Sequence, residues 1–292
     1  MNMSAGQGMY IIDLQKILTY REILDYAITL KRRYEPFVRL ESIGKSVEGK
    51  EMFGLSLGFG KKYLICIAGI HGRETINPAV FLEIAEDYCK AFWGENIYYG
   101  LPLKHILKEY SIFFIPLGNP DGYMSAIESN PFEKCNRNHI DLNRNFKSRF
   151  FVPNRYMLFA NSEPEVKAIT KVFCTLPSIG LLDFHSRGRG IYYYRKAMSK
   201  EYNIRQYQIG KKLAEISGYV LYPPEEEFGD MAGGNTVHYY SEYIRQPAFT
   251  IETVSETARF PLHYCWIKKT YEEIRRLPIE YLAFLSDDKK KI

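Results

Sequence analysis

The feature that most constrains this chain is an apolar run at residues 63–70, YLICIAGI, which leads directly into His71-Gly72-Arg73-Glu74. Because almost every side chain of the run is apolar, it predicts a central strand that is covered on both faces. In open α/β sheets, ligands bind at the carboxyl ends of the strands. The run therefore predicts a covered sheet, and it marks His71 and Glu74 as candidate functional residues.

Other segments repeat this pattern of an apolar strand followed by polar residues. Strands are predicted over residues 38–42, 51–57, 63–70, 111–117, 179–184 and 248–253. Apolar residues at helical spacing predict helices over residues 20–33 and 206–217, and helix-start residues predict two more that begin near residues 77 and 162. Strands that alternate with helices predict an α/β fold with a mixed, mostly parallel sheet flanked by helices.

The length and composition of the chain favour one large domain. With 292 residues, of which 46% are hydrophobic and 25% charged, the chain can bury one sizeable core. No Pro/Gly/Ser-rich linker, charge block or repeat divides it. We expect a single domain over residues 1–292, with residues 1–35 forming a helical segment packed on it.

The charge pattern and the cysteines argue against several classes of protein. The net charge of +5 is mild and dispersed, which gives little support to nucleic-acid binding. The five cysteines are scattered and include no CxxC pair, so a disulfide framework or a thiolate metal site is not expected. The first residues show neither a secretory signal nor a membrane anchor, which predicts a cytoplasmic location and no membrane partner. Non-standard export and the oligomeric state are left open.

Two histidines and a glutamate near predicted strand ends form a candidate metal site. His71 and Glu74 make an H-x-x-E pair on a turn, and His185 follows the strand at residues 179–184. About three imidazole and carboxylate ligands, with a fourth position for water, are typical of hydrolytic zinc sites. The close pair alone is a weak signal, because His and Glu three apart occur by chance in many chains. Glu252, near another strand end, is the candidate general base.

Five ordered motifs resemble those of the zinc carboxypeptidase family, the group that includes pancreatic carboxypeptidase A. They are IAGIHGRE at 67–74, NPDGY at 119–123, DLNRNF at 141–146, DFHSRG at 183–188 and FTIET at 249–253. The resemblance implies one zinc ion held by His71, Glu74 and His185, with Glu252 as the general base. It also implies that Asn143 and Arg144 hold the C-terminal carboxylate of a peptide substrate, a group that a guanidinium fits well.

Two positions depart from the family pattern. Many members carry an arginine that stabilises the oxyanion, where this chain has FEKCNR at residues 132–137. The spacing to the DLNRNF motif places Lys134 in that role and leaves Arg137 as the alternative. The family's mobile tyrosine has no clear counterpart in residues 225–234, where Phe228 is the candidate to occupy its space.

The resemblance implies hydrolysis of a peptide bond next to a free C-terminal carboxylate. Residues 132–146 and 185–195 resemble the bacterial branch of the family that cleaves γ-D-glutamyl-diaminopimelate bonds of cell-wall peptides. The expected specificity pocket follows the pair Gly233-Gly234 and contains the polar residues Thr236 and His238. Polar groups there favour a polar or zwitterionic end group over a large aromatic one.

Two other functions are open at this stage. A related N-acyl amino acid deacylase would use a similar set of two histidines and a glutamate on small substrates. The NPDG and DLNRNF motifs resemble carboxypeptidases more closely. A non-catalytic member of the fold that captures peptides would be expected to lack a ligand or the base, yet all four residues are present. A zinc carboxypeptidase is therefore the favoured interpretation.

Overall fold

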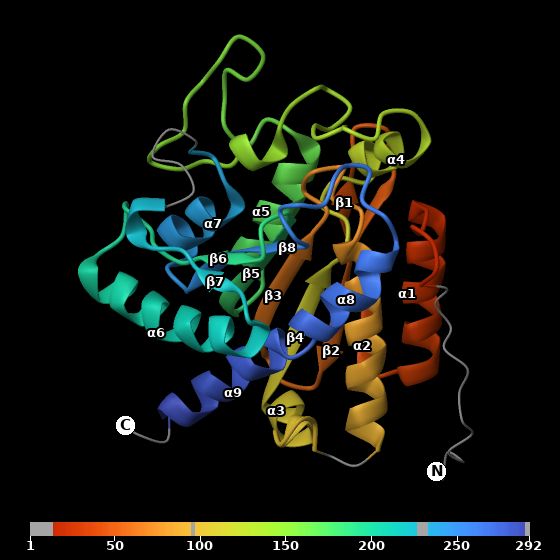
Figure 1. The fold of residues 1–292 in the computed structure, drawn as a ribbon, viewed down its shortest axis with the longest axis vertical. Helices are drawn as coiled ribbons and strands as arrows, with labels where there is room; N and C mark the ends of the chain where they lie inside the picture. The colour runs from red at the N-terminus through yellow and green to blue at the C-terminus, as the bar shows by residue number, and fades with distance from the viewer. Residues whose placement is uncertain (1–13, 95–96, 227–232, 290–292) are drawn as a thin grey trace.

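An eight-stranded sheet forms the centre of the protein. The computed structural model describes residues 14–94, 97–226 and 233–289 (Figure 1). The strands are β1 (Val38–Lys45), β2 (Glu51–Gly58), β3 (Lys62–Ala68), β4 (Tyr110–Ile115), β5 (Ser178–Ser186), β6 (Gly190–Tyr192), β7 (Val220–Leu221) and β8 (Ala248–Thr253). Their order across the sheet is β1-β2-β4-β3-β5-β8-β6-β7. The strands that carry or precede the candidate residues, β3, β5 and β8, are therefore neighbours.

The central pairings of the sheet are parallel. β3 pairs in parallel with both β4 and β5, β5 pairs in parallel with β8, and β6 does so with β7. The pairings of β1 with β2, β2 with β4, and β6 with β8 are antiparallel. The predicted α/β fold with a mixed, mostly parallel sheet is confirmed. Because neighbouring parallel strands end at the same edge, the residues that follow β3, β5 and β8 gather there.

Helices flank the sheet (Figure 1). The α-helices are α1 (Tyr20–Tyr34), α2 (Asn77–Trp93), α3 (Leu103–Glu109), α4 (Pro120–Glu128), α5 (Pro164–Thr175), α6 (Lys200–Ser217), α7 (Thr236–Tyr239), α8 (Cys265–Ile274) and α9 (Leu277–Lys289). Shorter turns are the 3-10 helices η1 (Leu142–Arg144) and η2 (Pro224–Glu226) and the π-helical turn η3 (Tyr240–Ile244). Within the described residues, every helix is too short or too polar to cross a membrane.

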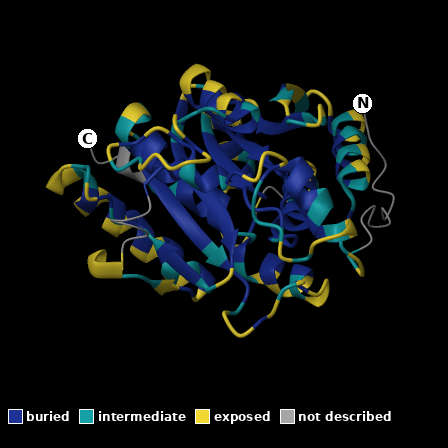
Figure 2. Cartoon of the chain, turned by 90° about the horizontal axis from the view of Figure 1, so that it is seen from above, coloured by how far each residue is buried: buried dark blue, intermediate teal, exposed yellow. Residues whose placement is uncertain are grey.

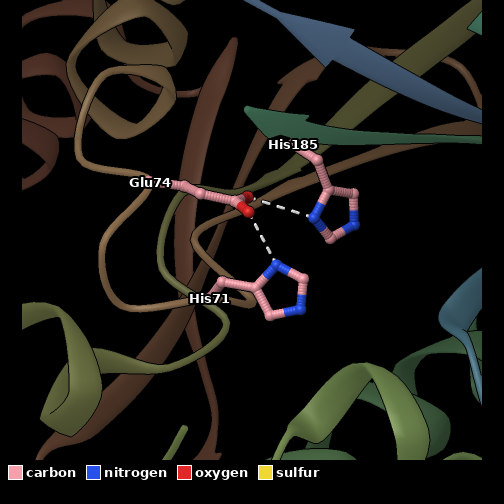
Figure 3. A group of neighbouring side chains, drawn as sticks. All are labelled: His71, Glu74 and His185. Atoms are coloured by element: carbon pink, nitrogen blue, oxygen red, sulfur yellow. Dashed lines mark hydrogen bonds and ion pairs between the residues drawn. The ribbon is translucent and has the colours of Figure 1, made fainter. Parts of the chain in front are cut away.

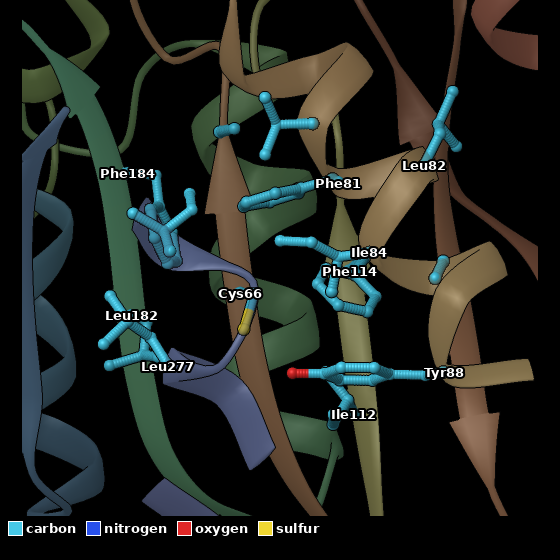
Figure 4. Packing of buried hydrophobic residues seen from close by; sticks show 14 of the residues in the cluster. Cys66, Phe81, Leu82, Ile84, Tyr88, Ile112, Phe114, Leu182, Phe184 and Leu277 are labelled. Carbon is cyan, nitrogen blue, oxygen red and sulfur yellow. The ribbon is translucent and has the colours of Figure 1, made fainter. Parts of the chain in front are cut away.

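Two hydrophobic cores cover opposite faces of the sheet. Along β3, Leu64, Cys66 and Ala68 belong to the larger core, whereas Ile65 and Ile67 belong to the smaller one. This alternation follows from the two-residue side-chain period of a strand, and it explains why the run is apolar throughout. Figure 4 shows part of the larger core, where side chains of α2 lie over the strands. Figure 2 shows the buried strands inside and the exposed residues on outer helices and loops.

The first helix, α1, packs on the larger core. Its start is capped by Thr19, whose side chain accepts a hydrogen bond from the backbone N–H of Glu22 while the Glu22 carboxylate accepts one from the backbone N–H of Thr19. Ile23, Ala27 and Leu30 are fully buried at helical spacing. The expectation of a single domain over residues 1–292 stays a prediction, because residues 1–13 lie outside the described part.

Candidate metal centre and active site

The carboxyl ends of β3, β5 and β8 bring the predicted site residues together. His71 and Glu74 lie in the connection from β3 to α2, and His185 lies near the end of β5. In β8, Glu252 is the register partner of His185. Residues that are far apart in sequence thus meet at one edge of the sheet.

The carboxylate of Glu74 lies between the two imidazole rings (Figure 3). Its Oε1 atom is 2.7 Å from Nδ1 of His71, and its Oε2 atom is 3.1 Å from Nδ1 of His185. One potential ligand atom from each residue lies within 4.8 Å of the others, and all three residues are buried. Two imidazoles and a carboxylate that converge in this way form a candidate site for one metal ion.

Each of these side chains shifts the pKa of its neighbours so that their charged forms are favoured. Burial raises the pKa of Glu74, but His71 and His185 outweigh this effect and lower that pKa to about 2. Burial lowers the pKa of each histidine, but nearby carboxylates outweigh it. Glu74 and Asp141 raise the pKa of His71, while Asp183 and Glu74 raise the pKa of His185. The cluster therefore attracts positive charge, as protons or as a metal cation.

A second carboxylate contacts each imidazole from its far side. Nε2 of His71 lies 3.2 Å from Oδ1 of Asp141, and Nε2 of His185 lies 3.0 Å from Oδ2 of Asp183. A carboxylate at Nε2 fixes the ring orientation and leaves Nδ1 for a metal, as is common around metal-binding histidines. Sequence reasoning gave these aspartates no role, although each begins a motif that it singled out, DLNRNF and DFHSRG.

Asn77, the first residue of α2, was also not predicted to act at the site. Its side-chain amide donates to the backbone carbonyl of His185 at 3.0 Å and accepts from the hydroxyl of Thr253 at 2.9 Å. These bonds tie the start of α2 to the ends of β5 and β8. Sequence reasoning recognised Asn77 only as a helix-start residue, because a contact over such a sequence distance has no local signal.

Glu252 lies beside the cluster with its carboxylate partly removed from solvent. The residue is of intermediate exposure, but its Oε2 atom is buried and has no hydrogen-bond partner among the described residues. Burial of the carboxylate raises its pKa to about 7, with Glu74 and Asp183 also raising it and the two histidines opposing them. A Cβ atom at Gly188 would lie 3.2 Å from the Cβ atom of Glu252, so glycine leaves space there. Such a group can accept a proton near neutral pH.

Lys134 lies at the cluster through its contact with Asp141. Its Nζ atom is 2.8 Å from Oδ2 of Asp141, the carboxylate that also contacts His71. The loop of Lys134 runs along the loop that carries the candidate ligands His71 and Glu74, because the backbone N–H of Gly72 donates to the Lys134 carbonyl at 3.4 Å. A Cβ atom at Gly72 would lie 2.2 Å from the carbonyl oxygen of Gly122. Glycine at position 72 therefore permits close backbone packing.

Arg137, the alternative oxyanion residue, points elsewhere. Its side chain is 61% exposed, and its Nε atom lies 2.8 Å from Oε1 of Glu48. An exposed ion pair of this kind is typical of the protein surface. The geometry therefore favours Lys134 over Arg137.

The residues expected to bind the substrate carboxylate, Asn143 and Arg144, lie in η1 and contact the start of α7. The side-chain oxygen of Asn143 accepts from the backbone N–H of Thr236 at 3.1 Å, and its Nδ2 atom is 3.4 Å from Nε2 of His185. Nη1 of Arg144 donates to the side-chain oxygen of Asn235 at 3.2 Å. η1 and the start of α7 therefore border one side of the cluster of His71, Glu74 and His185.

Thr236 and His238 are both buried, with exposed fractions of 0% and 4%. The Thr236 hydroxyl donates to the carboxylate of Asp183, next to the cluster. The ring centroid of His238 lies 6.4 Å from that of Phe150, in the loop after η1. Thr236 therefore joins the site through Asp183, whereas His238 packs against a neighbouring loop. Phe228, the candidate to replace the family's tyrosine, lies outside the described residues.

Known proteins share sequence with most of this chain. The profile of the family described as zinc carboxypeptidase matches residues 23–276. Carboxypeptidase D of Anas platyrhynchos is 28% identical over 174 residues, which cover 55% of this chain and 12% of that protein. Gamma-D-glutamyl-L-diamino acid endopeptidase 1 of Lysinibacillus sphaericus is 23% identical over 283 residues, which cover 86% of this chain and 69% of that protein.

A solved structure shares the fold. Bovine thrombin-activatable fibrinolysis inhibitor, in complex with tick carboxypeptidase inhibitor, superposes with a TM-score of 0.79 and 22% identity, covering 96% of this chain and 99% of that one. The chain spans 12% of the length of the bird carboxypeptidase D and 63% of the length of another curated relative, the Bacillus subtilis protein YqgT. Because the family match extends over residues 23–276, this protein belongs to the zinc carboxypeptidase family.

Proposed function

We propose that this protein is a zinc-dependent carboxypeptidase, which hydrolyses an amide bond next to a free C-terminal carboxylate. The observation that carries the proposal is the buried group of His71, Glu74 and His185, with Glu252 beside it in the neighbouring strand. Two imidazoles and a carboxylate fit a zinc ion that keeps a fourth position for water or substrate. Zinc bound there supplies a Lewis acid, which lowers the pKa of water and polarises a carbonyl group.

Glu252 acts in this proposal as the proton acceptor. Its carboxylate accepts a proton from the attacking water and later returns one to the leaving amine. A pKa of about 7 places the group between its two protonation states at neutral pH, so both transfers are feasible. The buried Oε2 atom has no hydrogen-bond partner among the described residues, which leaves it available for water.

Lys134 supplies positive charge to the oxygen that becomes negative as the tetrahedral intermediate forms. Its ammonium group is fixed by Asp141 at 2.8 Å and by the backbone contact between its loop and Gly72. Fixing the charge before the reaction reduces the reorganisation needed when the oxyanion develops. Arg137 has no part in this step, because its guanidinium is paired with Glu48.

Asn143 and Arg144 hold the terminal carboxylate of the substrate in this proposal. A guanidinium matches a carboxylate in charge and in the geometry of its donors. Since Asn143 lies 3.4 Å from His185, a carboxylate bound here would end close to the metal cluster. Holding the end of the chain in this way selects the last amide bond for attack.

We further propose that the substrates are cell-wall peptides with γ-D-glutamyl-diaminopimelate bonds. The relative from Lysinibacillus sphaericus, named as a gamma-D-glutamyl-L-diamino acid endopeptidase, matches 86% of this chain and supports this choice. The polar residues Asn235 and Thr236 beside Arg144 also suit a polar end residue.

The test is mass spectrometry of the products that the zinc-loaded protein forms from L-Ala-γ-D-Glu-diaminopimelate and from ordinary peptides with apolar, basic or acidic ends. We expect diaminopimelate to be released, and a chelator to stop the release. Glu252→Gln should keep its zinc and lose activity by about 100-fold or more, while Glu256→Gln, at an exposed carboxylate in the loop after β8, should stay active.

Release from ordinary peptides alone would retain the carboxypeptidase and overturn the wall-peptide substrate. Hydrolysis confined to N-acyl amino acids would favour a deacylase. Zinc binding with no hydrolysis of any of these compounds would favour a non-catalytic peptide-binding protein.

A further inference from the structure

Asp183 has one carboxylate oxygen that no described residue of the protein contacts by a hydrogen bond. The residue is fully buried and lies two positions before His185, so strand alternation directs both side chains to the same face of β5. Its Oδ2 atom contacts Nε2 of His185 at 3.0 Å and accepts from the Thr236 hydroxyl. Its Oδ1 atom is buried and has no hydrogen-bond partner within the described part of the chain. A buried acceptor without a partner is unfavourable, so this oxygen suits a donor from a ligand.

The surroundings of Asp183 are the segments proposed to hold the end of the substrate. Thr236, which donates to Asp183, also donates its backbone N–H to Asn143 at 3.1 Å. Next to it, Asn235 accepts from Arg144 at 3.2 Å, and its Nδ2 atom is buried without a hydrogen-bond partner among described residues. One side of this region thus offers donors that complement a carboxylate. Asp183 offers an acceptor that complements a cation.

We propose that Asp183 selects substrates whose C-terminal residue carries an ammonium group in its side chain, as lysine, ornithine and diaminopimelate do. This inference rests on the proposed carboxypeptidase function and specifies the end residue. The ammonium donates to Oδ1 of Asp183 while Asn143 and Arg144 hold the main-chain carboxylate. A site built to bond a polar group discriminates strongly against an analogue without it, because its own buried group is then left unpaired.

The test compares two peptides that differ only at the group in question, γ-D-Glu-L-Lys and γ-D-Glu-L-norleucine. Norleucine has a methyl group where lysine has its aminomethyl group, so the two side chains are otherwise alike. With the zinc-loaded protein, we expect kcat/KM for the lysine peptide to exceed that for the norleucine peptide by about 100-fold. In Asp183→Asn this ratio should fall to near one.

The ratio of the two kcat/KM values distinguishes substrate selection by Asp183 from its role in positioning His185. Asp183 also orients His185, and any loss of metal-site geometry should lower both rates alike and cancel in the ratio. Asp141→Asn is the matched control, because Asp141 holds the other imidazole through Nε2 at 3.2 Å. We expect it to slow both peptides while keeping the wild-type ratio.

Equal rates on both peptides, or a ratio that Asp183→Asn leaves unchanged, would overturn the role of Asp183 and leave the carboxypeptidase function intact. Binding of the same peptides to zinc-loaded Glu252→Gln, measured by calorimetry, gives a readout without turnover. Tighter binding of the lysine peptide there would support the role of Asp183 even if hydrolysis were absent, whereas equal affinities would again overturn it.

Discussion

At the scale of single residues, Glu74 and Glu252 show how the surroundings of a carboxylate determine its chemical role. Glu74 lies between two histidines, which lower its pKa to about 2, so it stays charged and suits a metal ligand. Burial and neighbouring carboxylates shift the pKa of Glu252 the other way, to about 7. Identical side chains thus serve as a permanent anion and as a group that can exchange protons.

The raised pKa of Glu252 predicts how activity depends on pH. Since only the deprotonated carboxylate accepts a proton, kcat/KM should fall as pH decreases through this pKa. A bound zinc ion adds positive charge and lowers the pKa, so the decline should begin at or below pH about 7. The measurement is a pH profile of kcat/KM with zinc content determined at each point. A profile that stays flat while zinc is retained would remove Glu252 from the role of base.

Lys134 and Arg137 form a matched pair of cations in one loop. Replacing Lys134 with methionine removes the charge next to Asp141 and should lower kcat by about 100-fold with little change in KM. Replacing Arg137 with methionine removes only its exposed ion pair with Glu48 and should have little effect. Steady-state kinetics of both variants provide the test. Equal losses in the two variants would show that Lys134 has no specific part in the reaction.

The candidate metal site could be located from sequence because its residues follow recognisable strands. His71, Glu74 and His185 each come near the end of an apolar run, and Glu252 lies within another. The choice between Lys134 and Arg137 needed the structure, since both are cations in the same loop and spacing alone favours one without excluding the other. Whether these residues bind metal and catalyse hydrolysis stays a prediction.

At the scale of elements, the strands that are buried on both faces could be predicted from the sequence. The predicted strand at 248–253 coincides with β8, and those at 63–70 and 111–117 overlap β3 and β4. These strands carry mostly apolar side chains, because a core covers each face of the sheet. The ends of β3 and β4 differ from the predicted ends by one or two residues, since a run of apolar residues can continue past the last paired position.

Elements that depend on distant contacts leave little signal in the sequence. β6 and β7 have three and two residues, too few for a period to be visible; β6 pairs with the edge of β8, and β7 pairs with β6. The helix α4 begins with a recognisable signal, since the Asn119 side chain accepts from the backbone N–H of Gly122 and Pro120 follows it. That segment had been interpreted only as the residues after a strand.

At the scale of the whole molecule, the proposed metal site combines parts of the chain that are far apart in sequence. His71 and Glu74 follow β3, whereas His185 belongs to β5. Zinc that binds these three ligands binds only the folded state, and it should therefore stabilise the protein by mass action. At a free zinc concentration about 100 times the dissociation constant, the gain in free energy of unfolding should be about 2.7 kcal/mol.

Thermal or denaturant unfolding with and without a chelator measures this gain. His185→Ala should abolish the zinc-dependent increment, while His105→Ala, at an exposed position of α3, should retain it. An increment of the same size in both variants would place the stabilising ion elsewhere on the protein.

The close packing at Gly72 has a consequence for how such a protein can change over time. Its backbone contacts with Gly122 and with the Lys134 loop pack the candidate metal ligand His71 and the proposed oxyanion residue Lys134 into one closely packed unit. Asp183, Asn235 and Thr236 lie on the other side, where contacts run through side chains. A mutation there can alter which molecule is accepted while the reaction itself is preserved. In laboratory evolution toward new substrates, we therefore expect the first successful mutations at or near Asp183, Asn235 and Thr236.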